Sequence, residues 1–233
     1  MIKRKKLGQH FLNSQLIASK IVLEANIGPD DTVYEIGTGL GILTRLLCKK
    51  AKKVISIEAD KNLFIQAQTK FVTTSNLSLK FGDGFKNKNR FTIFVSNLPY
   101  SKSKKAIEFL ASTPFSHGVI MVQKEFAEKI MGEKEKRSIQ IIANHCFEIK
   151  RLFKVGKENF SPPPKIDSVV LKIEKKINLD KELIKIINKI FSYKRKKVSN
   201  ILKQFGMENS SNQRLEELSN KEIIDLASKI YEK

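Results

Sequence analysis

The fold of this chain is set by ten residues, Thr32-Val33-Tyr34-Glu35-Ile36-Gly37-Thr38-Gly39-Leu40-Gly41. Their first half has the β-branched and aromatic character of a buried strand, and their second half is a glycine-rich turn. Helical spacing follows over residues 42–50, and a second β-type run follows at 54–57. A strand, a helix and a second strand in this order predict a βαβ unit, in which a right-handed crossover joins two parallel strands.

The same alternation continues along the chain. Its pattern predicts further helices at 12–25, 62–71, 104–111 and 124–131, and further strands at 77–81, 91–96, 119–122 and 169–173. The expected fold class is therefore α/β, a doubly wound, mostly parallel sheet. Beyond residue 178 the sequence is lysine-rich with helical spacing. Gly206 is expected to end one helix there, and Ser219 to open a capping box for the last one. We therefore expect a main domain over 1–175 and a small all-helical C-terminal domain over 178–233.

Charge is the main compositional feature. The 233 residues carry a net charge of +20, from 44 Lys+Arg and 24 Asp+Glu. Basic residues are in excess in both predicted domains, so the expected partner is a polyanion, with nucleic acid as the first candidate. No apolar stretch approaches the ~20 residues of a spanning helix, and no signal-type core follows the basic N-terminal arm, 1–11. We expect a cytoplasmic protein without a membrane partner. Cys48 and Cys146 form no metal-binding pattern, and no metal site is expected.

Polar residues stand at the ends of four predicted strands. Glu35 opens the motif E-x-G-x-G-x-G, whose spacing differs from the G-x-G-x-x-G of dinucleotide-binding folds. The second strand ends at Glu58, the third leads into Asp83 and the fourth is followed by Asn97. Taken alone, Glu58 or Asp83 would be interpreted as a turn residue or a helix cap. Ligands of open α/β sheets bind beyond the carboxyl ends of the strands, so four such ends in register predict one site.

This pattern resembles the S-adenosylmethionine-dependent methyltransferases and their Rossmann-like fold. The resemblance implies S-adenosylmethionine as the cofactor, with the glycine turn of Gly37, Gly39 and Gly41 facing its methionine part. It also implies that Glu58 grips both ribose hydroxyls and that Asp83 accepts a hydrogen bond from the adenine amine.

The segment Asn97-Leu98-Pro99-Tyr100 offers an amide, a rigid backbone carbonyl and an aromatic face. By itself it is as consistent with a turn as with an active site. Beside a cofactor it suits a flat base with an exocyclic amine. Asn97 and a carbonyl near Leu98-Pro99 would accept the amine N–H groups, which favours a pyramidal nitrogen, while Tyr100 stacks on the ring. Such a base must be single-stranded or flipped out.

Five segments resemble, in the same order, the ribosomal RNA adenine dimethyltransferases, the KsgA-like family. The resemblance covers about residues 5–175. It implies N6,N6-dimethylation of two adjacent adenosines near the 3′ end of small-subunit (16S) ribosomal RNA, with a role in small-subunit biogenesis and an assembly intermediate as partner. We expect a monomer. The segments are Gly8-Gln9-His10-Phe11-Leu12, the glycine turn, Asn97–Tyr100, Gln123-Lys124-Glu125 and Phe160-Ser161-Pro162-Pro163-Pro164-Lys165-Ile166-Asp167-Ser168.

The resemblance also assigns roles by position. Phe160 becomes a second stacking face opposite Tyr100. The candidate catalytic residues are Asn97, Leu98, Pro99 and Tyr100, and the candidate cofactor-binding residues are Gln9, His10, Leu12, Glu35, Gly37, Gly39, Gly41, Glu58, Asp83 and Asn97.

Other interpretations stay open at this point. The Erm-like branch shares several segments but methylates large-subunit (23S) ribosomal RNA and gives macrolide resistance. A non-catalytic RNA-binding assembly or transcription factor on the same fold is a second alternative, although Glu58, Asp83 and Asn97 favour retained catalysis. One departure concerns the target: Ser101-Lys102-Ser103-Lys104-Lys105 stands where the family usually has small residues and a proline.

Overall fold

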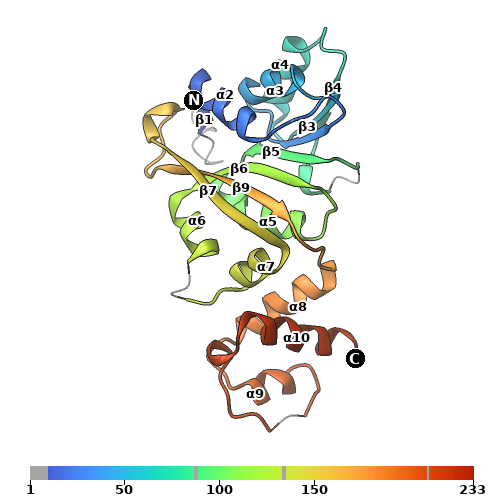
Figure 1. The fold of residues 1–233 in the computed structure, drawn as a ribbon, viewed down its shortest axis with the longest axis vertical. Coiled ribbons are helices and arrows are strands. Elements are labelled where there is room, and N and C mark those ends of the chain that lie inside the picture. Colours follow the sequence, from blue (N-terminus) through green and yellow to red (C-terminus); the bar gives the residue numbers. More distant parts are fainter. Residues whose placement is uncertain (1–9, 87–88, 133–134, 209) are drawn as a thin grey trace.

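The computed structural model describes residues 10–86, 89–132, 135–208 and 210–233. Within these residues a twisted seven-stranded sheet runs through the middle of the molecule, and helices cover both of its faces (Figure 1). In spatial order the strands are β4 (Leu77–Phe81), β3 (Lys53–Glu58), β2 (Thr32–Ile36), β5 (Ile93–Asn97), β6 (His117–Gln123), β9 (Ser168–Lys175) and β7 (Phe147–Val155).

Strands β4 to β6 are parallel, whereas β9 pairs antiparallel with both β6 and β7. The doubly wound, mostly parallel sheet is thus confirmed. The strand order reverses between β2 and β5, and ligands of such sheets bind at this switch point. A separate pair of short strands, β1 (Phe11–Leu12) and β8 (Phe160–Ser161), joins two segments far apart in sequence.

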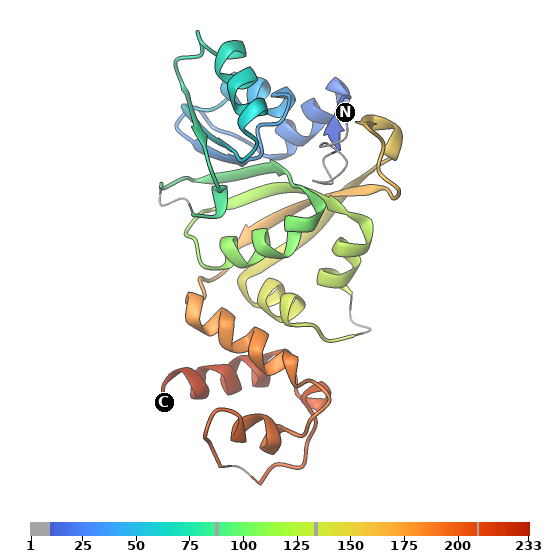
Figure 2. The same cartoon turned by 180° about the vertical axis from the view of Figure 1, so that it is seen from behind.

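Helices α2, α3 and α4 cover one face of the sheet, and α5, α6 and α7 cover the other; Figure 2 shows the same arrangement from behind. Beyond the second face lie α8, α9 and α10. The helices are α2 (Gln15–Glu24), α3 (Ile42–Cys48), α4 (Lys61–Lys70), α5 (Ser103–Ala111), α6 (Lys124–Met131), α7 (Ser138–Cys146), α8 (Lys181–Ser192), α9 (Val198–Lys203) and α10 (Asn220–Tyr231).

Two cores form because successive side chains of a strand point to opposite faces. In β2, Val33 packs in the core under α2 and α3, and Tyr34 packs in the core under α5 and α7. The Tyr34 ring stacks on Phe91 with centroids 4.8 Å apart. Its buried hydroxyl donates to the Gly84 carbonyl at 2.5 Å, so the polar end is satisfied. The same bond fixes the turn after β4.

The C-terminal helices continue the second core. Apolar side chains of α8, Ile184, Ile187 and Ile190, and of α10, including Ile223 and Ala227, belong to the same buried cluster as those of α5 and α7. That residues 178–233 form a domain of their own stays a prediction. The sheet and these helices share one continuous apolar core.

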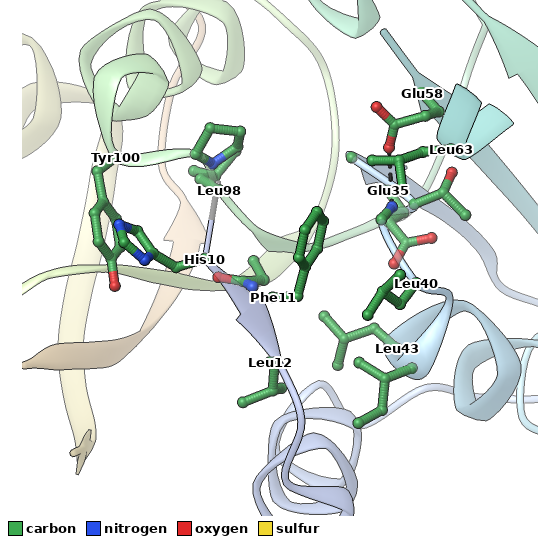
Figure 3. Close-up of a pocket in the computed structure, with 16 residues that line it drawn as sticks. His10, Phe11, Leu12, Glu35, Leu40, Leu43, Glu58, Leu63, Leu98 and Tyr100 are labelled. Atoms are coloured by element: carbon green, nitrogen blue, oxygen red, sulfur yellow. Dashed lines mark hydrogen bonds between the residues drawn. The ribbon is translucent and has the colours of Figure 1, made fainter. Parts of the chain in front are cut away.

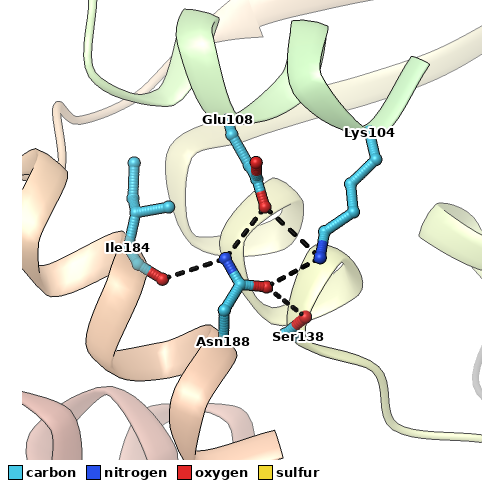
Figure 4. A network of polar contacts seen from close by, with 5 residues as sticks. All are labelled: Lys104, Glu108, Ser138, Ile184 and Asn188. Carbon is cyan, nitrogen blue, oxygen red and sulfur yellow. Dashed lines mark hydrogen bonds and ion pairs between the residues drawn. The ribbon is translucent and has the colours of Figure 1, made fainter. Parts of the chain in front are cut away.

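A polar network crosses the same junction (Figure 4). The side-chain oxygen of Asn188, on α8, accepts from the Lys104 ammonium at 2.9 Å and the Ser138 hydroxyl at 2.8 Å. Its amide donates to the Glu108 carboxylate at 2.9 Å and the Ile184 carbonyl at 3.1 Å. One side chain therefore links α5, α7 and α8.

Both predicted helix-end features of the C-terminal region are confirmed. The Ser219 hydroxyl accepts from the Glu222 N–H, and the Glu222 carboxylate accepts from the Ser219 N–H. Gly206 follows α9 with φ of 68°.

Three element predictions need correction. Leu12 was expected in a helix, but Ser14 caps α2, which begins at Gln15, and Leu12 lies in β1. The fourth strand lies at Ile93–Asn97 rather than 91–96. Strand β7 was missed altogether. It forms the edge of the sheet and has many polar and half-exposed positions, so its sequence lacks a clear apolar alternation.

Candidate active site

A groove opens where β2, β3, β4 and β5 reach their carboxyl ends. One cavity of about 80 Å³ lies beside the glycine turn, and another of about 440 Å³ lies toward Asp83. Gly37, Glu58 and Pro99 line both cavities, so the two form one groove. Figure 3 shows the smaller cavity, with Glu35 and Glu58 on one side and Leu98 and Tyr100 on the other. The four strand ends that the sequence singled out therefore meet, as expected.

The glycine turn is shaped by left-handed backbone. Gly41, which precedes α3, has φ of 76°, and a Cβ built on it would lie 2.6 Å from the Phe71 ring. Gly37 has φ of 85°, but a Cβ there would meet nothing within 4 Å. Gly41 is thus required by packing, whereas Gly37 keeps the wall of the groove free of a side chain.

Glu35 lies buried beneath this turn. One carboxylate oxygen accepts from the Thr44 hydroxyl at 2.7 Å and the Ser56 hydroxyl at 2.6 Å. Burial raises the pKa of Glu35 to about 7, against the effect of these two hydrogen bonds, and the charge of Glu58 raises it further. A carboxyl that titrates near neutrality therefore lies beside the glycine turn of the groove.

Glu58 ends β3 with its carboxylate held on both sides. Oε2 accepts from the Gly39 N–H at 2.9 Å and Oε1 from the Asp60 N–H at 2.8 Å. The side chain is only 5% exposed, yet it lines both cavities. Each oxygen keeps a second lone pair, so the carboxylate can accept from two vicinal hydroxyls.

Asp83 lies in the larger cavity, on the turn after β4. Oδ1 accepts from the Phe85 N–H at 3.0 Å, and Oδ2 accepts from the Lys105 ammonium at 2.8 Å. Partial burial raises the pKa of Asp83, but the hydrogen bonds from Lys105 and Phe85 and the charges of Lys105 and Lys86 outweigh it, so the pKa lies below its ordinary value.

The target-motif segment, Asn97–Tyr100, forms the opposite wall. Ser96 donates to the Ile36 carbonyl at 2.6 Å, which ties the end of β5 to the end of β2. The Pro99 carbonyl accepts from the Lys102 N–H at 2.8 Å and starts the 3₁₀ turn η2 (Tyr100–Lys102). Both contacts hold the end of β5 and the turn that follows it in place on this side of the groove.

Tyr100 is fixed at both ends. Its hydroxyl shares a hydrogen bond of 2.7 Å with the buried Ser168 hydroxyl. Its ring stacks on His10, with centroids 5.4 Å apart and planes at 28°. Burial raises the pKa of Tyr100. The phenol is neutral at physiological pH, which suits stacking rather than acid–base chemistry.

The N-terminal segment His10–Leu12 lines the groove. All three of its residues line the smaller cavity, and His10 Nδ1 lies 2.8 Å from the Pro162 carbonyl oxygen. The Phe11 ring reaches 3.4 Å from the position that a Cβ on Gly39 would take. Gln9, predicted to bind the cofactor, lies outside the described residues.

Phe160 occupies a different place from the one its predicted role requires. Its ring is 3% exposed and packs in the core under α2 and α3, in register with Leu12. The ring that faces Tyr100 is that of His10. Stacking of Phe160 on a target base stays a prediction, and it requires the ring to leave this core position.

Sequence reasoning missed several residues of the site. Ser56 carries no pattern of its own, because a hydroxyl acquires its role from the partner that the fold supplies. Phe11 and Ser168 stand in segments that resemble the family, but neither was given a role. Lys105 was visible only as a departure from the family pattern.

The groove suits S-adenosylmethionine on structural grounds. Gly37 leaves the turn open to the ligand, Glu35 offers a carboxyl to a cationic methionine end, and Glu58 and Asp83 offer oxygens further along. Among the residues that the structure describes, no helix is long and apolar enough to span a bilayer.

Comparison with known proteins identifies the family. The model described as ribosomal RNA adenine dimethylase matches residues 2–230. A ribosomal RNA small subunit methyltransferase A of Thermotoga neapolitana is 37% identical over 235 residues, which span 96% of this chain and 90% of that protein. The protein of the same name from Malacoplasma penetrans is 38% identical over 233 residues, spanning 94% and 84%.

Solved structures of related enzymes share the fold of this chain. A dimethyladenosine transferase from Plasmodium falciparum superposes with a TM-score of 0.77 at 26% identity, covering 96% of this chain and 98% of that one. The 23S rRNA methyltransferase ErmE gives 0.68 at 22% identity, covering 95% and 99%, and supports the fold alone. The Rossmann-like methyltransferase fold is thereby confirmed. With a match that runs almost from end to end, this chain belongs to the ribosomal RNA adenine dimethylase family and is a methyltransferase.

Proposed function

We propose that this protein dimethylates the N6 amino groups of two adjacent adenosines near the 3′ end of small-subunit (16S) ribosomal RNA. The observation that carries the proposal is the position of Asn97–Tyr100, which shares one cavity with the glycine turn and Glu58. This supports the proposal, because an amine bound at Asn97 would lie beside the groove proposed for the cofactor. Relatives named ribosomal RNA small subunit methyltransferase A, at 37% and 38% identity, support the small subunit as the source of the target.

S-adenosylmethionine, when bound, supplies an electrophilic methyl group. The glycine turn and Glu35 would hold its methionine part, Glu58 its ribose hydroxyls and Asp83 its adenine amine. The protein needs no strong base for this chemistry, because the main requirement is to align the nucleophile and exclude water. His10 and Phe11 line the groove and would help to exclude water from it.

The target adenosine is positioned by the motif itself. Its amine would donate to the Asn97 side-chain oxygen and the Leu98 carbonyl, which draws the nitrogen lone pair out of conjugation with the ring. Tyr100 would stack on the base, an interaction worth roughly 1–3 kcal/mol. The bond between Tyr100 and Ser168 holds that ring in place before the base arrives.

The proposed partner is ribosomal RNA within a small-subunit assembly intermediate, bound by a monomer. The +20 charge supports a polyanionic partner. Methylation of large-subunit RNA, the Erm-like alternative, rests on the shared sequence segments. It has the weaker support, because the 23S rRNA methyltransferase structure is 22% identical and shows the fold alone.

The test offers the protein labelled S-adenosylmethionine with two substrates in separate reactions, undermethylated small subunits and protein-free 23S RNA. Digestion and separation of nucleosides should give dimethyladenosine from the small-subunit RNA. Label in the 23S RNA alone would transfer the proposal to the Erm-like function. Cofactor binding without transfer to either RNA would point to a non-catalytic role.

A further inference from the structure

Lys105 lines the larger cavity of the groove. It lies in the first turn of α5, five residues after Tyr100, and its ammonium donates to Asp83 Oδ2 at 2.8 Å. The same ammonium lies 4.8 Å from the centroid of the Phe85 ring. Both Lys105 and Asp83 line the larger cavity.

These contacts do more than pair two surface charges. An exposed ion pair contributes little by itself, and these side chains are 48% and 38% exposed. Here, however, the carboxylate is held on both sides, since Oδ1 accepts from the Phe85 N–H. The turn beneath is held as well, through the bond from Tyr34 to the Gly84 carbonyl. Lys105 supplies the remaining restraint on the orientation of Asp83.

We infer that Lys105 is a positioning residue for the cofactor, which fixes the Asp83 carboxylate in the orientation that receives the adenine amine. Each carboxylate oxygen keeps one lone pair beside its present donor, so Asp83 can accept from adenine without releasing Lys105. The inference rests on the proposed function, in which Asp83 receives adenine.

The test measures binding of S-adenosylhomocysteine and S-adenosylmethionine by calorimetry to the full-length protein. Lys105→Met keeps a straight apolar chain over Phe85 but removes the donor. It should weaken binding about tenfold, in line with the loss of one charge-assisted hydrogen bond. Lys105→Arg should retain most of the affinity. Lys104→Met, which removes the same charge from the neighbouring position facing α8, should bind as the wild type does.

A double-mutant cycle separates positioning from other roles. If Lys105 acts through Asp83, Lys105→Met should have no further effect on affinity in an Asp83→Asn background. In Lys105→Met, the loss of cofactor affinity on acidification should also begin at a higher pH, because Asp83 loses the partner that keeps it ionised. Circular dichroism checks that each variant is folded.

Wild-type affinity in Lys105→Met, or an equal further loss in the Asp83→Asn background, would overturn the inference while leaving the proposed function in place. No binding of either compound by the wild-type protein would overturn the proposed function and the role of Lys105 with it.

Discussion

Asn97 is the last residue of β5 and the first residue of the target-motif segment. Asn97→Ala removes the side-chain oxygen that accepts the target amine. We expect kcat/KM for methyl transfer to fall by at least about 100-fold, the usual effect of deleting one aligned polar group at a reacting centre. The melting temperature should hardly change, since the residue is only half-buried. Methyl incorporation into undermethylated small subunits measures the effect.

The matched control is Asn178→Ala, an identical change at an exposed position between β9 and α8. It should leave transfer unchanged. Turnover near the wild-type level in Asn97→Ala would remove Asn97 from the proposed mechanism.

Glu35 makes stability depend on pH. Its pKa in the folded protein, about 7, exceeds the ordinary glutamate pKa of 4.5, so the folded state binds the proton more tightly than the unfolded state does. The stabilisation is fully present below pH 4.5 and is lost as the pH rises toward 7. The full contribution is on the order of 3 kcal/mol. Urea unfolding between pH 5 and 8 measures it.

Glu35→Gln is the control for this prediction, because glutamine cannot titrate but can still accept from Thr44 and Ser56. Its unfolding free energy should vary less across the same range. Parallel pH profiles for the two proteins would mean that Glu35 does not titrate there.

At the scale of elements, the turn from β2 into α3 offers two glycines that differ in one respect. Both Gly41 and Gly37 have positive φ, but only Gly41 faces a ring at 2.6 Å. Gly41→Ala should cost clearly more than the roughly 1 kcal/mol of backbone strain that Gly37→Ala incurs. Gly37→Ala should instead weaken cofactor binding, since its Cβ enters the groove. Equal losses of stability in thermal melts would contradict this account.

The sequence predicted the elements whose pattern is local and strong. Strands β2, β3 and β5 were readable because burial on both faces imposes continuous apolar runs. Strand β7 was not readable, since an edge strand owes its pairing to β9 and only part of its length is buried. The pairing of β1 with β8 joins positions about 150 residues apart, and two residues carry no period.

The residues of the site show the same difference between local patterns and long-range contacts. Glu35, Glu58, Asp83 and Asn97 were found because their position at strand ends is a property of the sequence. The burial of Phe160 and the stacking of His10 on Tyr100 depend on how the N-terminal segment folds back, which no local pattern encodes.

At the scale of the whole molecule, Asn188 links three helices. Asn188→Ala leaves the Glu108 carboxylate and the Ser138 hydroxyl without this partner, and we expect a loss of about 1–3 kcal/mol in unfolding free energy. Hydrogen exchange should quicken in α8 before it does so in the sheet. Ser192→Ala, an exposed change on the same helix, is the control and should have no effect. Unchanged exchange in α8 would show that apolar packing alone holds the helix.

The net charge of +20 is also a property of the whole molecule, and it should govern the affinity for RNA. If about six phosphates are contacted, affinity for ribosomal RNA should fall about 1,000-fold between 50 and 200 mM salt through counterion release. Fluorescence anisotropy with a labelled RNA fragment measures the slope. S-adenosylhomocysteine binding over the same series is the control and should change little. A change in RNA affinity below about threefold would mean that the basic residues do not meet the phosphates.

The apolar core that runs without interruption from the sheet into α8 and α10 limits how this protein can be rebuilt. A region that folds around its own core can be exchanged between relatives as a cassette. Here the facing residues of α5 and α7 would have to change together with the C-terminal helices, because each side completes the packing of the other. The C-terminal helices and helices α5 and α7 are thus expected to change together in evolution. A chimaera that exchanges only the C-terminal helices would pack poorly where they meet α5 and α7.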